Sequence, residues 1–251
     1  MSLQENKQVN LYIGTSGWAY DHWLGGFYPQ GLPRTKWLEF YNQRFSTVEL
    51  NSSFYHMPSE KAFTTWRQKS SDNFVYAVKV SRLITHLKKL RNVAEPLENF
   101  LQRAQILGAK LGPLLYQLPP NMRRNDAVLE AFLNLLPHQL CHVFEFRNES
   151  WLDEAVFDLL KQHNVGFCIY DAPGFTTPLV ATASFAYLRF HGSQYLYGSC
   201  YSDAELEEWA NRIERLGQGV TSIYIYFNND TEAFAVKNAK RLLDMLSASP
   251  I

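Results

Sequence analysis

The chain has few of the features that mark a secreted, disulfide-stabilised or zinc-binding protein. Its 251 residues include three cysteines, Cys141, Cys168 and Cys200, and no CxxC pair or zinc-like spacing connects them. Cys168 lies in the apolar run VGFCIY, where a buried, reduced thiol is the expected state. None of the three has a base beside it in sequence, which argues against a cysteine nucleophile.

The sequence also lacks an excess of charge of either sign. It contains 24 acidic and 24 basic side chains, which argues against broad attraction to nucleic acid or to an anionic membrane and leaves only a local patch for nucleic acid. The N-terminus, MSLQENKQVN, lacks the apolar core of a signal peptide, and no apolar run is long enough to span a bilayer. We therefore expect a cytoplasmic, soluble protein without a membrane partner, and its oligomeric state is open.

What the sequence does contain is enough apolar material for a large core. Hydrophobic residues make up 46% of the chain and aromatic residues 15%, too much for a disordered protein. No stretch resembles an interdomain linker, and no internal repeat is visible. We therefore predict a flexible N-terminal segment over residues 1–10 and a single domain over residues 11–251.

Eight short β-type runs, most followed by an amphipathic stretch, predict an α/β protein. The runs are LYIG (11–14), TVEL (47–50), FVYAVKV (74–80), LLYQL (114–118), VFEFR (143–147), GFCIYD (166–171), YLRFH (187–191) and SIYIYF (222–227). A mean spacing of about 30 residues favours a single (β/α)₈ TIM barrel over the runner-up, an open doubly wound sheet.

Helix boundaries carry recognisable signals. Asp126 and Asp153 are placed to cap helices, and Ser202 with Glu205 forms a capping box. Between strands six and seven, DAPGFTTPLVATASFA contains two prolines and is too short for a good helix. We expect a reduced helix at that point.

Several strands carry charged or amide side chains at alternate positions near their carboxyl ends. Because side chains alternate between the two faces of a strand, apolar Phe144 and Phe146 should face the helices, and Glu145 and Arg147 the barrel interior. The same parity and position apply to Glu49, Asn51, Lys79, Gln117, Arg189 and His191, while Asp171, Asn228 and Asp230 follow the sixth and eighth strands. In TIM barrels the active site is built at this end, so we expect a polar site there.

Seven segments, in order, resemble the YecE-like family, the domain of unknown function 72. They are IGTSGWAYDHWLGGFYP (13–29), ELNSSFYHMP (49–58), the stretch from Lys79 to Thr85–His86, LGPLLYQLPP (111–120), FEFRNESW (144–151), YLRFHG (187–192) and YFNND (226–230). The resemblance extends from Leu11 to about Leu246. It implies a single-domain TIM barrel and a site in these segments, but no particular reaction, because the family has no established activity.

Buried charges must pair with one another, with water or with a ligand. One interpretation is a self-satisfied ion-pair network that fills the barrel. The other is a site, with Glu49, Glu145, His191 and Asp171 as candidate catalytic groups. The candidate ligand-binding residues are Lys79, Arg147, Arg189, Asn51, Gln117, Asn228, Asp230, Trp18, Tyr55, Trp151 and His86.

Three cations in this set fit a phosphate- or carboxylate-bearing ligand better than a metal ion. We therefore predict no metal site and no cofactor, with a divalent metal as the less favoured alternative. A Schiff-base role for Lys79 is disfavoured because acidic neighbours should raise its pKa.

We predict an enzyme performing acid/base chemistry on a small, polar, anionic metabolite that carries a ring, since aromatic side chains are frequent in the loops after the strands. The sequence does not distinguish a hydrolase, a lyase and an isomerase. The alternative is a non-catalytic binding module for a nucleotide, a sugar or a nucleic-acid end.

Overall fold

The computed structural model describes residues 9–248, and within them eight parallel strands form a nearly closed barrel. The strands are β1 (Asn10–Thr15), β2 (Thr47–Leu50), β3 (Val75–Lys79), β4 (Leu111–Gln117), β5 (His142–Glu145), β6 (Gly166–Ala172), β8 (Phe185–Phe190) and β9 (Ser222–Phe227). Each of the eight predicted runs overlaps one of them. The predicted TIM barrel is confirmed.

The barrel closes where β1 meets β2. The hydrogen-bonded order begins at β1, passes through β9 and β8, and ends at β2. A single parallel bridge joins Ser16 to Glu49 across the remaining seam, and the N–H of Gly17 donates to the carbonyl of Glu49 at 2.8 Å. The two edge strands are therefore neighbours, as an open doubly wound sheet would not allow, and that alternative is wrong.

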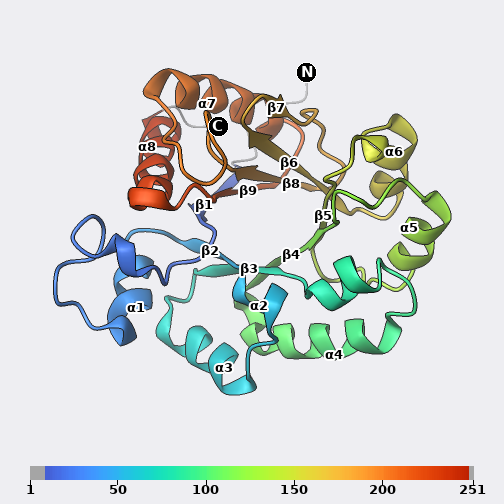
Figure 1. The fold of residues 1–251 in the computed structure, drawn as a ribbon, viewed down its shortest axis with the longest axis horizontal. Helices are drawn as coiled ribbons and strands as arrows, with labels where there is room; N and C mark the ends of the chain where they lie inside the picture. Colours follow the sequence, from blue (N-terminus) through green and yellow to red (C-terminus); the bar gives the residue numbers. More distant parts are fainter. Residues whose placement is uncertain (1–8, 249–251) are drawn as a thin grey trace, which may run out of the picture.

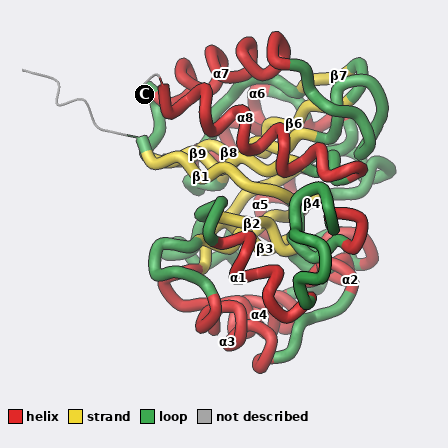
Figure 2. The backbone as a smooth tube through the Cα atoms, turned by 90° about the vertical axis from the view of Figure 1, so that its left-hand side faces the viewer, coloured by secondary structure: helices red, strands yellow, loops and turns green. Residues whose placement is uncertain are grey.

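Helices enclose the strands in chain order, as the colours of Figure 1 show. They are α1 (Trp37–Asn42), α2 (Ser52–Tyr55), α3 (Glu60–Lys69), α4 (Ala94–Ala104), α5 (Asp126–Leu133), α6 (Glu154–Gln162), α7 (Asp203–Gly217) and α8 (Phe234–Ala248). Figure 2 shows the strands between α7 and α8 on one side and α1, α3 and α4 on the other. None of the helices in residues 9–248 is long and apolar enough to cross a membrane.

Short helical turns connect several of these elements. They are η1 (Asp21–Trp23), η2 (Arg34–Lys36), η3 (Leu83–Leu87), η4 (Gln105–Lys110), η5 (Glu149–Trp151) and η6 (Thr231–Ala233). Four of them, η1, η3, η5 and η6, follow β1, β3, β5 and β9 on the carboxyl side of the barrel, in the loops of the predicted site.

The helix caps follow the sequence signals with one exception. Ser202 and Glu205 form both halves of the capping box at the start of α7, and Asp153 caps α6 by accepting from the N–H of Ala155 at 3.0 Å. In α5 the cap is Asn125, which accepts from Val128 at 3.0 Å, and Asp126 lies in the first turn. The predicted cap is wrong by one residue because both neighbours carry side chains able to cap.

The segment after β6 contains no helix at all. A two-residue strand, β7 (Phe175–Thr176), pairs antiparallel with the end of β6 across a turn at Gly174, whose φ is +70°. Residues 177–184 then lead to β8 without regular structure. The predicted reduced helix is thus replaced by a hairpin, because Pro173 and Pro178 cannot donate the hydrogen bonds of a helix interior.

Residues 1–8 of the predicted flexible N-terminal segment lie outside the described residues. Residues 9 and 10 are described, and Asn10 already belongs to β1, where it pairs with Ser222 of β9. The domain predicted from residue 11 therefore begins at least one residue earlier.

The predicted alternation of inward-facing and outward-facing side chains is confirmed. Val48, Leu50, Phe144, Phe146, Leu188 and Phe190 belong to the large buried cluster shared with the helices. A second, smaller cluster fills the barrel interior and includes Ala77, Leu115, Val143, Cys168, Tyr187 and Tyr226. Its members come from alternate positions of their strands, and the polar residues of the predicted site continue the same series toward the carboxyl ends.

The β1–β2 seam should be sensitive to any side chain at Gly14. An added Cβ would overlap the carbonyl oxygen of Thr47, which belongs to the facing backbone and has little room to move. We expect Gly14→Ala to lower the free energy of unfolding by about 1–3 kcal/mol.

Urea denaturation measures this loss, with Gly219→Ala as the matched control because its Cβ would meet nothing closer than 3.9 Å. The control should change stability by about 0.5 kcal/mol or less. Equal effects of the two substitutions would contradict a tight seam.

Candidate functional site

One arginine connects two carboxylates across the barrel interior. Arg189 of β8 is 1% exposed, and its Nη2 donates to Oε1 of Glu49 on β2 at 2.8 Å. Its Nη1 donates to Oε2 of Glu145 on β5 at 2.5 Å. Both glutamates are fully buried. These three residues, the Glu49–Arg189–Glu145 bridge, tie together strands from three parts of the barrel wall.

Glu49 has donors on both of its oxygens. Ser16 donates to Oε1 at 2.6 Å, in addition to Arg189, and the hydroxyl of Tyr187 donates to Oε2 at 2.6 Å. Donors on both oxygens fix the position of the carboxylate. Glu49 is therefore held in place with little capacity left to contact a ligand.

Glu145 is held in a similar way. Gln117 donates to its Oε1 at 2.7 Å, and Arg147 forms an ion pair with the same oxygen. Burial alone would raise the pKa of Glu145, but Arg147 and Arg189 outweigh it and hold that pKa well below the ordinary 4.5. The carboxylate therefore stays ionised, which makes it a poor general acid and a weak base.

His191 is a neutral imidazole with both nitrogens engaged. Nη2 of Arg147 donates to its Nε2 at 2.8 Å, and Nδ2 of Asn228 lies 3.2 Å from its Nδ1. Burial and the charge of Arg189 lower the pKa of His191 well below its usual value. At neutral pH the ring acts as an acceptor for Arg147 rather than as a charged group.

Above the bridge lies a cavity of about 670 Å³, here called the mouth cavity. It opens at the carboxyl ends of the strands, the end at which the sequence predicted a site. Eight of its lining residues are polar and three are aromatic: Asn51, Lys79, Arg82, His86, Gln117, Arg189, Asn228, Asp230, Phe54, Tyr55 and Tyr197. Three cations face one carboxylate, so the lining is positive at neutral pH.

A second cavity of about 580 Å³ adjoins the mouth cavity, with which it shares His86, Gln117 and Tyr197. Arg147 lies in its wall, with its guanidinium 4.4 Å from the centre of the Tyr170 ring. The two cavities together give a ligand access to both Arg147 and Arg189.

Lys79, unlike Arg189 and Arg147, lacks an anionic partner in the described part of the chain. Within residues 9–248 its ammonium forms no ion pair or hydrogen bond, and Nζ lies 4.3 Å from the centre of the Phe54 ring. Burial and the charge of Arg189 lower the pKa of Lys79 to about 8, although Glu145 and Glu49 act in the opposite direction. The expectation that acidic neighbours would raise this pKa overall is wrong, because burial and the charge of Arg189 outweigh them.

Two further titratable groups line the mouth cavity. Burial and the charge of Lys79 lower the pKa of His86 to about 4, so its ring is neutral at pH 7. Its Nδ1 lies 2.9 Å from the hydroxyl of Thr85. Burial raises the pKa of Asp230, whose backbone carbonyl accepts from Trp23 at 3.0 Å.

Three of the sequence-predicted residues lie away from the mouth cavity. Asp171 points to the helix side of β6, accepts from Tyr201 at 2.8 Å, and lines a separate pocket of about 330 Å³. Trp151 is fully buried and donates to the carbonyl of Met122 at 2.7 Å. Trp18 packs edge-on against Trp66 with ring centres 5.7 Å apart. The other predicted residues surround the mouth cavity, the adjoining cavity or the bridge beneath them.

Some residues of the site escaped the sequence analysis. Tyr187 and Tyr170 have the same parity as Arg189 and Cys168, so the alternation rule could have identified them. Arg82 lies three residues after Lys79 in the loop that follows β3, and its charge and its place after a strand end were the available signals. By the same alternation rule, Asp171 lies on the same face of β6 as Ile169, so its side chain faces the helices.

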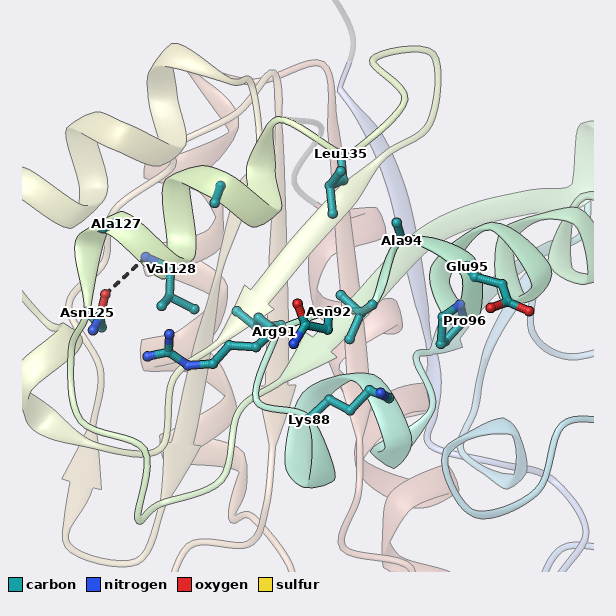
Figure 3. A pocket seen from close by; sticks show the side chains of 13 residues that line it. Lys88, Arg91, Asn92, Ala94, Glu95, Pro96, Asn125, Ala127, Val128 and Leu135 are labelled. Atoms are coloured by element: carbon teal, nitrogen blue, oxygen red, sulfur yellow. Dashed lines mark hydrogen bonds between the residues drawn. The ribbon is translucent and has the colours of Figure 1, made fainter.

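A larger pocket, of about 810 Å³, lies outside the barrel (Figure 3). It is formed by residues 88–96 and the face of α5, including Lys88, Arg91, Asn125 and Leu135. It contains none of the predicted site residues. Within residues 9–248 no three His, Cys, Asp or Glu side chains converge in the manner of a metal site.

An α/β barrel of eight parallel strands, with a polar cavity at their carboxyl ends, defines a protein of the TIM-barrel class. Within this class the chain belongs to the family described as protein of unknown function DUF72, whose model matches residues 12–250. The predicted membership of the YecE-like family is confirmed.

The chain is similar to two curated members of the group named UPF0759. It is 26% identical to the protein YunF of Bacillus subtilis (strain 168), over 94% of each chain. It is 30% identical to the protein YecE of Escherichia coli (strain K12), over 56% of this chain and 50% of that protein.

Solved structures show the same architecture. A DUF72 family protein from Thermotoga maritima has a TM-score of 0.87 and 29% identity, covering 95% of this chain and 99% of that one. A putative vitamin-B12 independent methionine synthase from Listeria monocytogenes has a TM-score of 0.53 and 10% identity, covering 96% and 98% of the two chains. The second likeness is one of fold alone.

The buried bridge should control the stability of the protein in acid. The pKa of Glu145 is depressed in the folded state, so below about pH 4.5 the unfolded chain binds more protons, and stability falls as the pH decreases. Glu145→Gln should remove this part of the pH dependence. At pH 7 it should also lower the free energy of unfolding by roughly 3–5 kcal/mol, because Arg189 loses one of its two partners.

Urea denaturation between pH 3 and pH 7 measures both effects. The control is Glu130→Gln on α5, since Glu130 is exposed and forms no ion pair within residues 9–248. It should leave the pH profile unchanged. An unaltered acid slope in Glu145→Gln would show that the bridge does not govern acid stability.

Proposed function

We propose that this protein is an enzyme that performs proton-transfer chemistry on a small anionic metabolite carrying a ring, bound in the mouth cavity. The observation that carries the proposal is the pair of cations in the lining, Lys79 and Arg82, which form no ion pair within the described residues and face the single carboxylate of Asp230. A phosphate or carboxylate group would balance this charge, and Arg offers two parallel donors to either.

The amide groups of the lining suit a polar ligand. Asn51, Gln117 and Asn228 come from three different strands or strand ends and all reach the cavity. The Oδ1 of Asn51 is buried and has no hydrogen-bond partner within the described part of the chain. A buried acceptor of this kind costs about 1–3 kcal/mol unless a donor reaches it. A ligand hydroxyl or amino group would satisfy it.

Aromatic side chains at the opening favour a ligand with a ring. Tyr55 and Tyr197 line the mouth cavity and are 64% and 44% exposed, and the buried ring of Phe54 forms part of the wall. Exposed tyrosines beside a polar cavity provide flat apolar faces on which a sugar or heterocycle can stack. The aromatic part of the lining would contact the ring of the ligand, and the cationic part would contact its anionic group.

The group best suited to move a proton is Lys79. It lines the cavity and, unlike Arg189, is not paired with a carboxylate within the described residues. Lys79 has a pKa of about 8, close to neutral pH, as an efficient general base or acid requires. Glu49 and Glu145, predicted from sequence as proton-transfer groups, have surroundings that suit them better to positioning Arg189 and Arg147.

A non-catalytic binding module is the second candidate. The exposed Tyr195, at 59%, with Tyr55 and Tyr197, provides a rim of the kind that stacks nucleobases or sugars without chemistry. A binding module of this kind needs the rim and the cations but no group of tuned pKa.

Arg82 provides the test of anion binding. Arg82→Ala should weaken the binding of phenyl phosphate, measured by isothermal titration calorimetry, by about tenfold or more, because a charge-assisted hydrogen bond contributes roughly 1.5–3 kcal/mol. Arg91→Ala is the matched control, since Arg91 belongs to the same connection after β3 but lines the outer pocket of Figure 3. Equal weakening in both variants, or no binding by the unaltered protein, would reject the anion site.

An assay for substrate conversion distinguishes an enzyme from a non-catalytic binding module. The protein is incubated with a mixture of polar metabolites in deuterium oxide, and mass spectrometry records which compounds change or gain deuterium. We expect at least one anionic compound to change, and the change to be absent with Lys79→Met. A compound that is bound and co-purified but never altered would support the binding module instead.

A further inference from the structure

We propose that Lys79 is an amine nucleophile that forms an imine with an aldehyde or ketone group of the anionic ligand. This inference rests on the proposed function and names the substrate class of the same cavity. It begins from the environment of Lys79 at the carboxyl end of β3, where the ammonium faces the mouth cavity and the ring of Phe54, 4.3 Å away.

A buried lysine with a structural role donates its ammonium protons to nearby oxygens, and Lys110 is an example in this chain. Its Nζ donates to the carbonyls of Arg67 and Ser70, each at 2.7 Å, and to the hydroxyl of Ser70 at 3.2 Å. All three ammonium donors are thereby used. Lys79, in contrast, has no such acceptor within residues 9–248 and points at open volume, so its amine is free to react.

The charges around Lys79 also favour the neutral amine that attacks a carbonyl carbon. The carboxylates whose charge acts on Lys79 are Glu145 and Glu49. Both are already paired with arginines, Glu145 with Arg189 and Arg147 and Glu49 with Arg189. Burial, followed by the positive charge of Arg189, disfavours the ammonium form, and the pKa of Lys79 falls to about 8. A lysine placed beside another cation in a desolvated cavity is the known arrangement for amine nucleophiles.

The step is balanced without any further reagent. The nitrogen lone pair of Lys79 forms a bond to the carbonyl carbon, the C=O π pair moves to oxygen, and the oxygen takes a proton. The hydroxyl then leaves with a second proton as water, which gives an iminium ion on Nζ. From the ammonium form, the net change is ammonium plus carbonyl to iminium plus water, so no oxidant or metal is needed.

Neighbouring groups can serve these proton movements. His86 is neutral at pH 7, and within residues 9–248 its Nε2 has no hydrogen-bond partner, while Nδ1 faces Thr85. The free Oδ1 of Asn51 can accept from the hydroxyl of the tetrahedral intermediate. Arg82 can hold the anionic group of the ligand, which places the carbonyl within the cavity rather than in solvent.

Reductive trapping tests the inference. The whole protein is treated with pyridoxal 5′-phosphate, an aldehyde that carries a ring and a phosphate, then reduced with sodium borohydride and mapped by mass spectrometry. At pH 8 about half of Lys79 is unprotonated, against well under 1% of an ordinary lysine, so its labelling should be roughly a hundredfold faster than that of an exposed lysine such as Lys88. Inorganic phosphate should slow the labelling of Lys79 and not that of Lys88.

The pH dependence provides a second readout. The labelling rate of Lys79 should rise through pH 8 and level off above about pH 9, where nearly all of the amine is neutral. Labelling of Lys79 no faster than that of Lys88, or a rate that continues to climb beyond about pH 10, would overturn the inference.

Lys79→Arg separates this inference from the proposed function. The variant keeps a cation in the cavity, so phenyl phosphate should still bind with an affinity within about threefold of the original, while trapping at this position is lost. Retained binding of phenyl phosphate together with failure to trap Lys79 in the unaltered protein overturns the imine alone. Absence of phenyl phosphate binding in the unaltered protein overturns the anion site and the imine together.

Discussion

The Glu49–Arg189–Glu145 bridge is the interaction on which the rest of the site depends. It places a guanidinium and two carboxylates in a region where water does not screen them, and charges there are stable only when fully paired. Ser16, Tyr187 and Gln117 complete the hydrogen bonding of the carboxylates. The bridge also joins β2, β5 and β8, so the geometry of the carboxyl end of the barrel depends on a polar network rather than on apolar packing alone.

This pairing determines which groups remain available for chemistry. Both glutamates are paired with arginines, and burial and the charge of Arg189 keep His191 neutral, so that it accepts from Arg147. Lys79 is left without a carboxylate, beside the positive charge of Arg189, at the edge of an open cavity. The acids hold the cations in place, and the proposed function assigns the reactive role to the amine of Lys79. The division of roles is thus opposite to the one that the residue types suggest.

Much of the fold and part of the site could be predicted from the sequence. The eight strands, the parity that separates Glu145 and Arg147 from Phe144 and Phe146, and the capping box at Ser202 all depend on local alternation or local hydrogen bonding. Applied to every strand, the alternation of side chains would have excluded Asp171 from the predicted site and included Tyr187. The hairpin of β7 was missed because two prolines exclude a helix but do not specify its replacement.

The sequence by itself determined the barrel, the face on which each strand residue lies, and the end at which polar residues gather, because these follow from periodicity along one chain. The tertiary structure alone decided which charges pair. Glu49 and Arg189 are 140 residues apart, and Glu145 and Arg189 are 44 apart. The pKa of Lys79 depends on the sum of such distant charges and on burial. No local pattern contains that sum, since it exists only when the strands are brought together.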